Sequence, residues 1–204
     1  MKQLFIIFFL SISAAAFAVP TNKQHKKITK ATTAIINGAP TTAPFYALLG
    51  NSSSPGGGMI IADRWILTAG HTTLYYPVYA GAFDRNNLPS SRNILSAISH
   101  ESFSDTPNPS NDIGLIQLSQ PLTFSSTISP IKLASSANAS MWDNGQSGNV
   151  YGMGFTSPGV LSQVLLNTNV NLINNSNSIN EKKIYAAGPN NNDACNGDSG
   201  GPLT

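Results

Sequence analysis

Residues 193–203 have the sequence DACNGDSGGPL, in which Ser199 lies among glycines and directly follows the acidic residue Asp198. Glycines at such positions let the backbone bend sharply and present N–H groups with no side chain in the way. An Asp-Gly turn in a glycine-rich loop would account for any two of these residues, but not for the whole string. The string therefore indicates a serine that takes part in chemistry.

Two further segments hold the partners that a nucleophilic serine needs. A serine hydroxyl is a poor nucleophile at neutral pH, so it requires a histidine within hydrogen-bond reach and a carboxylate that fixes the histidine's tautomer. His71 ends the segment DRWILTAGH (63–71), and Asp112 precedes an apolar run in NDIGLIQL (111–118). A carboxylate buried at the mouth of an apolar strand would need such a partner.

Three segments resemble the signature motifs of chymotrypsin-like and trypsin-like serine peptidases: TAGH (68–71), NDIGL (111–115) and GDSGGP (197–202). Their order, His then Asp then Ser, is also that family's order and differs from the order in subtilisin-like and α/β-hydrolase enzymes. The resemblance extends over residues 35–204. It implies a serine endopeptidase that forms an acyl-enzyme intermediate.

The resemblance also assigns roles to individual residues. Ser199 is implied to be the nucleophile, His71 the general base and then acid, and Asp112 the group that orients His71. By the same match, the backbone N–H groups of Gly197 and Ser199 form the oxyanion hole.

The segment IING (35–38) resembles the new N-terminus that this family exposes when its precursor is cleaved. In that scheme the freed ammonium of Ile35 turns inward and pairs with Asp198, which orders the substrate pocket. An ordinary first strand with an exposed carboxylate is the alternative. The family usually has Lys or Arg before this point, whereas here Ala34 precedes Ile35 and the nearest basic residue is Lys30. Another activating protease, trimming after a cut at Lys30, or impaired activation would each fit.

Asp193 lies six residues before Ser199 and matches the floor of the primary specificity pocket in trypsin-like members. A carboxylate there favours Lys or Arg at the residue before the cleaved bond. The alternative is an ordinary loop aspartate after a run of asparagines.

Cysteine usage departs from the family. Gly56 and Thr72 stand where the family has two cysteines, which indicates the loss of one disulfide. The residue that matches Cys195 normally bonds to a cysteine farther along than Thr204. We therefore expect a C-terminally truncated member, poorly soluble and with little activity when expressed alone.

Short apolar and β-branched clusters separated by turn residues predict an all-β protein. The resemblance implies two six-stranded antiparallel β-barrels of the chymotrypsin type, the second incomplete at the C-terminus. Residues 35–130 are expected to form the first barrel, with a connector at 120–130, and residues 131–204 the second. The clusters that predict strands are 45–49, 59–68, 74–80, 94–98, 113–118, 149–155 and 161–172.

The N-terminal residues have the layout of a secretory signal peptide. Lys2 precedes an apolar run that ends at the small-x-small triplet AFA (16–18). An uncleaved membrane anchor is the alternative, but the run is short for a bilayer. We assign residues 1–18 to the signal and the basic, polar residues 19–34 to a pro-segment, and expect an extracellular protein.

Charge and composition exclude some functions. From Ile35 onward six basic residues face nine acidic ones, which counts against a nucleic-acid partner. No cluster of acidic ligands suggests a metal, and no cofactor is expected. Protein or peptide substrates, proteinaceous inhibitors and a monomeric state are expected. Sequons for N-glycosylation occur at Asn51, Asn138 and Asn174.

Two other functions compete with a trypsin-like endopeptidase. One is a non-catalytic peptidase homologue that binds a partner, although such homologues usually lose a residue of the triad. The other is an inactive fragment.

Overall fold

The computed structural model describes residues 35, 37–104, 110–135, 144–157, 160–173, 183–189 and 192–204. The predicted signal peptide, the predicted pro-segment and the sequons at Asn138 and Asn174 lie outside these residues. Regular structure in the described part consists of strands and two short 3-10 helices, η1 (Gly70–Thr72) and η2 (Arg85–Asn87). The all-β prediction is confirmed.

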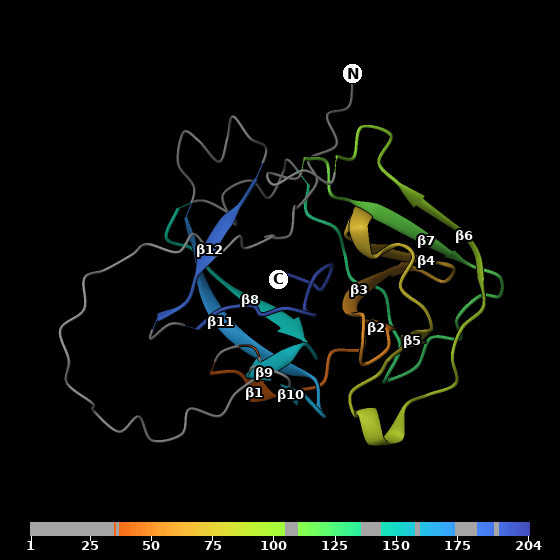
Figure 1. The fold of residues 1–204 in the computed structure, drawn as a ribbon, viewed down its shortest axis with the longest axis horizontal. Helices are drawn as coiled ribbons and strands as arrows, with labels where there is room; N and C mark the ends of the chain where they lie inside the picture. Colours follow the sequence, from red (N-terminus) through yellow and green to blue (C-terminus); the bar gives the residue numbers. More distant parts are fainter. Residues whose placement is uncertain are drawn as a thin grey trace.

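The first half of the chain forms a six-stranded antiparallel sheet (Figure 1). One edge strand contains Val78, which pairs with Arg92, two residues before the other edge strand begins; the Arg92 N–H donates to the Val78 carbonyl at 2.8 Å. The sheet therefore closes on itself, as predicted for the first barrel. In spatial order its strands are β5 (Val78–Ala80), β2 (Tyr46–Gly50), β3 (Pro55–Ala62), β4 (Trp65–Thr68), β7 (Gly114–Leu118) and β6 (Ile94–Ser99).

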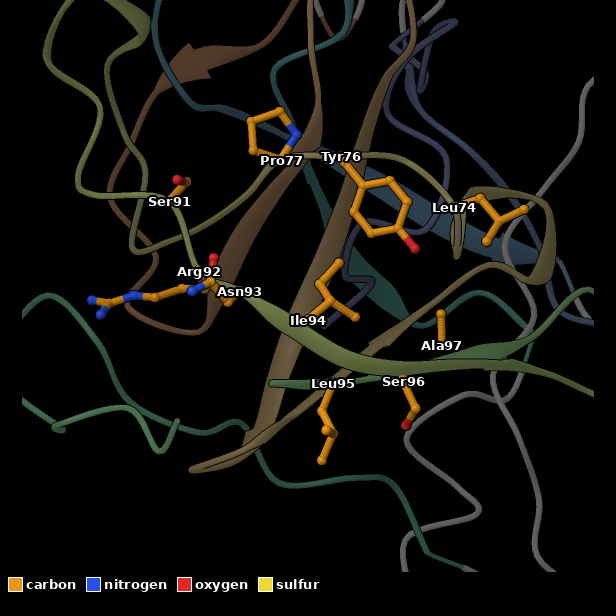
Figure 2. Close-up of a pocket in the computed structure, with 10 residues that line it drawn as sticks. All are labelled: Leu74, Tyr76, Pro77, Ser91, Arg92, Asn93, Ile94, Leu95, Ser96 and Ala97. Carbon is orange, nitrogen blue, oxygen red and sulfur yellow. The ribbon is translucent and has the colours of Figure 1, made fainter. Parts of the chain in front are cut away.

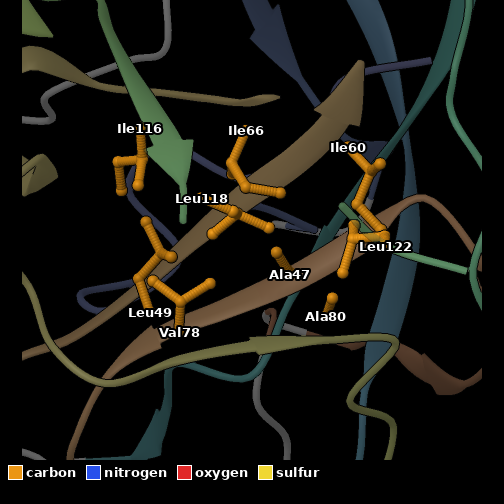
Figure 3. Packing of buried hydrophobic residues seen from close by; sticks show 9 residues of the cluster. All are labelled: Ala47, Leu49, Ile60, Ile66, Val78, Ala80, Ile116, Leu118 and Leu122. Carbon is orange, nitrogen blue, oxygen red and sulfur yellow. The ribbon is translucent and has the colours of Figure 1, made fainter. Parts of the chain in front are cut away.

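The interior of this barrel is apolar because its strands alternate. In β7, Gly114, Ile116 and Leu118 are buried while the residues between them are partly exposed. Each fully buried aliphatic side chain of this kind contributes about 1.5–3 kcal/mol. The resulting core (Figure 3) consists of Ala47, Leu49, Ile60, Ile66, Val78, Ala80, Ile116, Leu118 and Leu122.

The second half is built around the long strand β11 (Leu166–Ile173), which pairs with β8 (Ser147–Gly152) on one edge and with β12 (Tyr185–Ala187) on the other. β11 also pairs with β1 (Ala39–Pro40), so the first strand of the range predicted as the first barrel belongs to the second sheet. β9 (Phe155–Ser157) and β10 (Val160–Leu161) form a separate pair.

The two halves share a second apolar cluster, which fixes their relative position. All of β2 is buried, and its residues alternate between the two cores: Ala47 and Leu49 face the barrel interior, whereas Tyr46 and Leu48 pack with Met153 and Leu165 of the second half. The loops that carry the candidate site come from both sides of this interface.

Candidate active site

His71 and Asp112 are brought together by strand pairing. β4 leads directly into η1, which contains His71, and Asp112 lies just before β7; the two strands pair with Thr68 opposite Gly114. The Asp112 carboxylate therefore contacts His71 twice. Its Oδ2 is 2.7 Å from the His71 ring Nδ1, and its Oδ1 accepts the His71 backbone N–H at 2.9 Å.

The electrostatics of this pair keep Asp112 ionised. The Asp112 side chain is 5% exposed and that of His71 28%. Burial alone would raise the pKa of the Asp112 carboxyl, but the hydrogen bonds from His71 outweigh it and hold this pKa below its ordinary value. An ionised carboxylate only accepts hydrogen bonds, so the ring nitrogen facing it carries the hydrogen and Nε2 is left as the basic nitrogen.

Ser199 lies in a tight turn that packs against the same corner of the first barrel. The Gly57 N–H of β3 donates to the Ser199 carbonyl at 2.8 Å. The next residue, Gly200, has φ +79°, and any side chain there would collide with the Thr68 hydroxyl and the Ala69 backbone. The Ser199 loop thus contacts the end of β4, just before His71.

The turn leaves two backbone N–H groups without a protein acceptor. Gly197 has φ +92°, and a side chain there would collide with Pro55 and with the Gly154 backbone. Within the described part of the chain, neither the Gly197 nor the Ser199 N–H donates to another protein group. These are the two donors that the sequence predicts for the oxyanion hole.

Asp198 and Ile35 occupy different surroundings. The Asp198 carboxylate is buried and accepts the Gly154 N–H at Oδ1 (2.7 Å) and the Cys195 N–H at Oδ2 (2.8 Å). Burial raises the pKa of the Asp198 carboxyl to about 6, while these hydrogen bonds and the Arg85 charge act in the opposite direction. Ile35 is fully buried and packs with Leu166. Their predicted pairing requires a cleaved chain and stays a prediction.

Asp193 lies on the loop between β12 and the turn that contains Ser199, and it is partly buried. Its Oδ1 accepts the N–H of Ala194 at 2.8 Å. Burial raises the pKa of the Asp193 carboxyl, and the hydrogen bond from Ala194 opposes this shift. No cation contacts this carboxylate within the described residues. A cationic ligand would compensate the cost of burying this carboxylate.

Comparisons with known proteins identify the family. The family model described as Trypsin matches residues 35–204. The chain belongs to the trypsin family. Trypsin delta of Drosophila erecta is 34% identical over 217 aligned positions, which cover 96% of this chain and 83% of the relative. Coagulation factor IX of Oryctolagus cuniculus is 30% identical, over 81% of this chain and 66% of the relative.

A solved structure extends the likeness to three dimensions. Neuropsin, described as a serine protease expressed in the limbic system of mouse brain, has a TM-score of 0.70 and 26% identity to this chain. The alignment covers 82% of this chain and 81% of neuropsin. Membership of the trypsin family makes this protein a trypsin-like serine endopeptidase.

Near the two positions where the resemblance implies a lost disulfide, hydroxyl groups connect β3, β4 and η1. A Cβ atom at Gly56 would lie 3.4 Å from Thr72 Cγ2, so these two positions are adjacent. The Thr72 hydroxyl donates to the Ala69 carbonyl (2.9 Å) and lies 2.6 Å from the Thr68 hydroxyl, which donates to Gly57 at 2.7 Å. The sequence signal for this network, two threonines four residues apart, is too common to predict it.

A groove of about 560 Å³ lies elsewhere on the first barrel, at the seam where the sheet closes (Figure 2). Residues 74, 76, 77 and 91–97 line it, with Leu74, Tyr76 and Leu95 exposed. It contains no residue of the candidate active site.

The part of the chain that the structure describes contains no helix long and apolar enough to cross a membrane. Among the same residues, no three or more His, Cys, Asp or Glu side chains gather where they could hold a metal ion.

Proposed function

We propose that this protein is a secreted endopeptidase that cleaves peptide bonds after Lys or Arg by a triad of Ser199, His71 and Asp112. The observation that carries the proposal is the double contact between Asp112 and His71 beside the Ser199 loop. Such a contact holds the imidazole in one tautomer and one orientation, as a general base requires.

The first half-reaction begins when His71 Nε2 takes the proton of the Ser199 hydroxyl. The Ser199 oxygen bonds to the peptide carbonyl carbon, and the carbonyl oxygen becomes an oxyanion that accepts from the Gly197 and Ser199 N–H groups. The intermediate collapses as the C–N bond breaks, and His71 gives its proton to the leaving amine. An ester on Ser199 remains.

Water completes the cycle by the same route. His71 removes a proton from a water molecule, whose oxygen attacks the ester carbonyl, and then returns the proton to the Ser199 oxygen as the C–O bond breaks. Asp112 stays ionised throughout and stabilises the imidazolium that forms twice per cycle. Its lowered pKa suits this role.

Asp193 would select the substrate. Its partly buried carboxylate has no cationic partner among the described residues, and burial raises its pKa. A Lys or Arg side chain entering beside it would lower this pKa, favour the charged form and make a charge-assisted hydrogen bond.

Activation would supply a second cation. Cleavage before Ile35 would create an ammonium that pairs with Asp198, whose carboxyl is buried and whose pKa is raised to about 6. Because Ala34 precedes Ile35, the activating protease would not be one that requires a basic residue there.

The substrates would be extracellular proteins or peptides, with proteinaceous inhibitors as further partners and a monomer as the working form. The predicted signal at residues 1–18 supports secretion. The sequon at Asn51 lies on an exposed turn, where a glycan could be attached.

The test uses the full chain with an enteropeptidase cleavage sequence placed directly before Ile35. After cleavage, we expect labelling by a fluorophosphonate and slow hydrolysis, in line with the low activity that the sequence predicts for this chain expressed alone. The hydrolysis should be faster for an arginine amide than for a phenylalanine amide. Ser199→Ala should abolish both, since removing such a nucleophile costs about a million-fold in turnover. A folded, cleaved chain that is neither labelled nor active would indicate a non-catalytic homologue.

A further inference from the structure

Arg85 begins the short helix η2 in the first half of the chain and fastens it to the second half. The Asp84 side chain caps this turn by accepting the Asn86 N–H at 2.8 Å. The Arg85 N–H donates to the Gln163 carbonyl at 2.8 Å, and Asp84 pairs with Val164. The backbone at Arg85 is therefore held against the segment between β10 and β11.

The Arg85 side chain reaches farther into the second half. Its Nε donates to the Ser162 carbonyl at 2.9 Å and its Nη2 to the Met153 carbonyl at 2.7 Å. Within the described residues no carboxylate contacts this guanidinium directly. The two hydrogen bonds are charge-assisted, and such bonds are about twice as strong as neutral ones.

The peptide unit between Met153 and Gly154 connects this guanidinium to Asp198. Its carbonyl accepts from Arg85, and its N–H donates to Asp198 Oδ1 at 2.7 Å. The positive and negative side chains thus lie at opposite ends of one peptide dipole and polarise it in the same direction. Met153 is fully buried, so its carbonyl has no ready replacement donor from solvent.

Asp198 connects the Met153–Gly154 peptide to the Ser199 loop. Its second carboxylate oxygen accepts the Cys195 N–H at 2.8 Å, and its own N–H donates to the Cys195 carbonyl at 3.0 Å. These bonds fix the turn that contains Gly197, whose N–H is a proposed oxyanion donor. A rotation of the Met153–Gly154 peptide would remove one of the two bonds that hold the Asp198 carboxylate.

We propose that Arg85 is a positioning residue that holds the oxyanion loop in shape from the other half of the molecule, through the Met153–Gly154 peptide and Asp198. The consequence for catalysis rests on the proposed function, whereas the consequence for the loop does not. If Arg85 only linked the two halves, its loss would destabilise the whole fold and would not affect the loop more than any other part.

The first arm of the test measures amide hydrogen exchange on the full, uncleaved chain. In Arg85→Met, which keeps the apolar stem but removes the donors, the Gly154 and Cys195 amides should exchange at least about 10-fold faster. The Ile116 amide in the barrel should be unchanged. Arg64→Met, which removes the same charge from the turn between β3 and β4, is the matched control. Equal acceleration at Ile116 and Gly154, or none at either, overturns the proposal.

The second arm measures amidase activity after cleavage before Ile35. Loss of a well-placed oxyanion donor costs about 100-fold to 1,000-fold in kcat, so its displacement in Arg85→Met should cost about 10-fold to 100-fold, with KM changed less than about 3-fold. Arg85→Lys keeps one charged donor and should recover at least about 5-fold of the loss.

The two arms separate the possible failures. If Arg85→Met does not fold, Arg85→Lys and Arg85→Gln provide the same comparison, and an unchanged kcat in both overturns the proposal. If the wild-type chain is neither labelled nor active, the proposed function fails, and the exchange arm alone decides whether Arg85 holds the loop.

Discussion

Cysteines introduced at positions 56 and 72 should form a disulfide that stabilises the first barrel. A Cβ atom at Gly56 would lie 3.4 Å from Thr72 Cγ2, which occupies a position open to a cysteine sulfur. In a disulfide the two Cβ atoms lie about 3.8 Å apart with both sulfurs between them, so a sulfur at the place of Thr72 Cγ2 lies within reach of a sulfur carried by the Cβ at position 56. The Tyr75 ring, 3.0 Å from the same Cβ, has to shift by a few tenths of an ångström.

The expected stabilisation follows from the length of the closed loop. The cross-link joins positions 56 and 72, and a loop of about that size gives about 3 kcal/mol in the chain-entropy model. For a domain of this size that corresponds to a rise in the unfolding midpoint of about 6–12 °C. Losing the Thr72 hydroxyl offsets about 1–2 kcal/mol, so the gain over the wild type is smaller than the gain over the reduced variant.

The assay is thermal unfolding of the Gly56→Cys/Thr72→Cys variant with and without reductant, in a Cys195→Ala background that prevents mispairing. The Thr72→Cys single variant controls for the lost hydroxyl. The reasoning is refuted if the oxidised variant keeps two free thiols, or if its midpoint lies within about 2 °C of the reduced form.

Three further predictions concern single carboxylates. Asp112→Asn should lower kcat about 10,000-fold in amide hydrolysis with little change in KM, because His71 loses its tautomer; a loss below 10-fold would remove Asp112 from the triad. Asp193→Ser should reduce the ratio of kcat/KM for arginine over phenylalanine amides about 100-fold, and an unchanged ratio would place the specificity pocket elsewhere. In the uncleaved chain, the folded Asp198 carboxyl has a pKa of about 6, against the ordinary aspartate pKa of 3.8, so the folded chain holds this proton more tightly than the unfolded chain does. Its contribution to stability is therefore greatest below about pH 4 and is lost as the pH rises through 6, by about 3 kcal/mol in all. Urea unfolding from pH 4 to 7 should show this slope in the wild type and not in Asp198→Asn, and parallel profiles would contradict it.

Much of the first barrel could be predicted from the sequence because its strands are long and apolar. The sequence predicts a single strand region over residues 59–68, whereas the structure has two strands, β3 and β4, separated at Asp63 and Arg64. In the cluster 74–80 only Val78–Ala80 forms a strand; Pro77, which has no N–H to donate to a sheet, directly precedes it. The strands β1, β9, β10 and β12 have two or three residues each, too few to show a period in sequence.

In the site, too, short motifs predict some residues, whereas contacts between residues far apart in sequence cannot be predicted. Short motifs predict His71, Asp112 and Ser199 as the triad, and the structure adds that β4–β7 pairing places the first two in contact. Arg85 could not be found this way. It begins an Asn-rich turn that is typical of a surface loop, and the carbonyls it binds belong to residues 68 and 77 positions away in sequence. Tertiary hydrogen bonds of this range leave no local pattern.

The glycines of the string GDSGG are required by the position of the Ser199 loop between the two halves. Gly197 touches Pro55 of the first half and Gly154 of the second, and Gly200 packs against Thr68 at the end of β4. Both have positive φ, a conformation that costs other residues about 1–2 kcal/mol even before any collision. The loop is thus wedged between the two halves, with Asp198 buried at its centre. Because each half fixes one side of the loop, a change in their packing acts on Ser199 directly, and residues such as Arg85 can influence catalysis without touching the substrate.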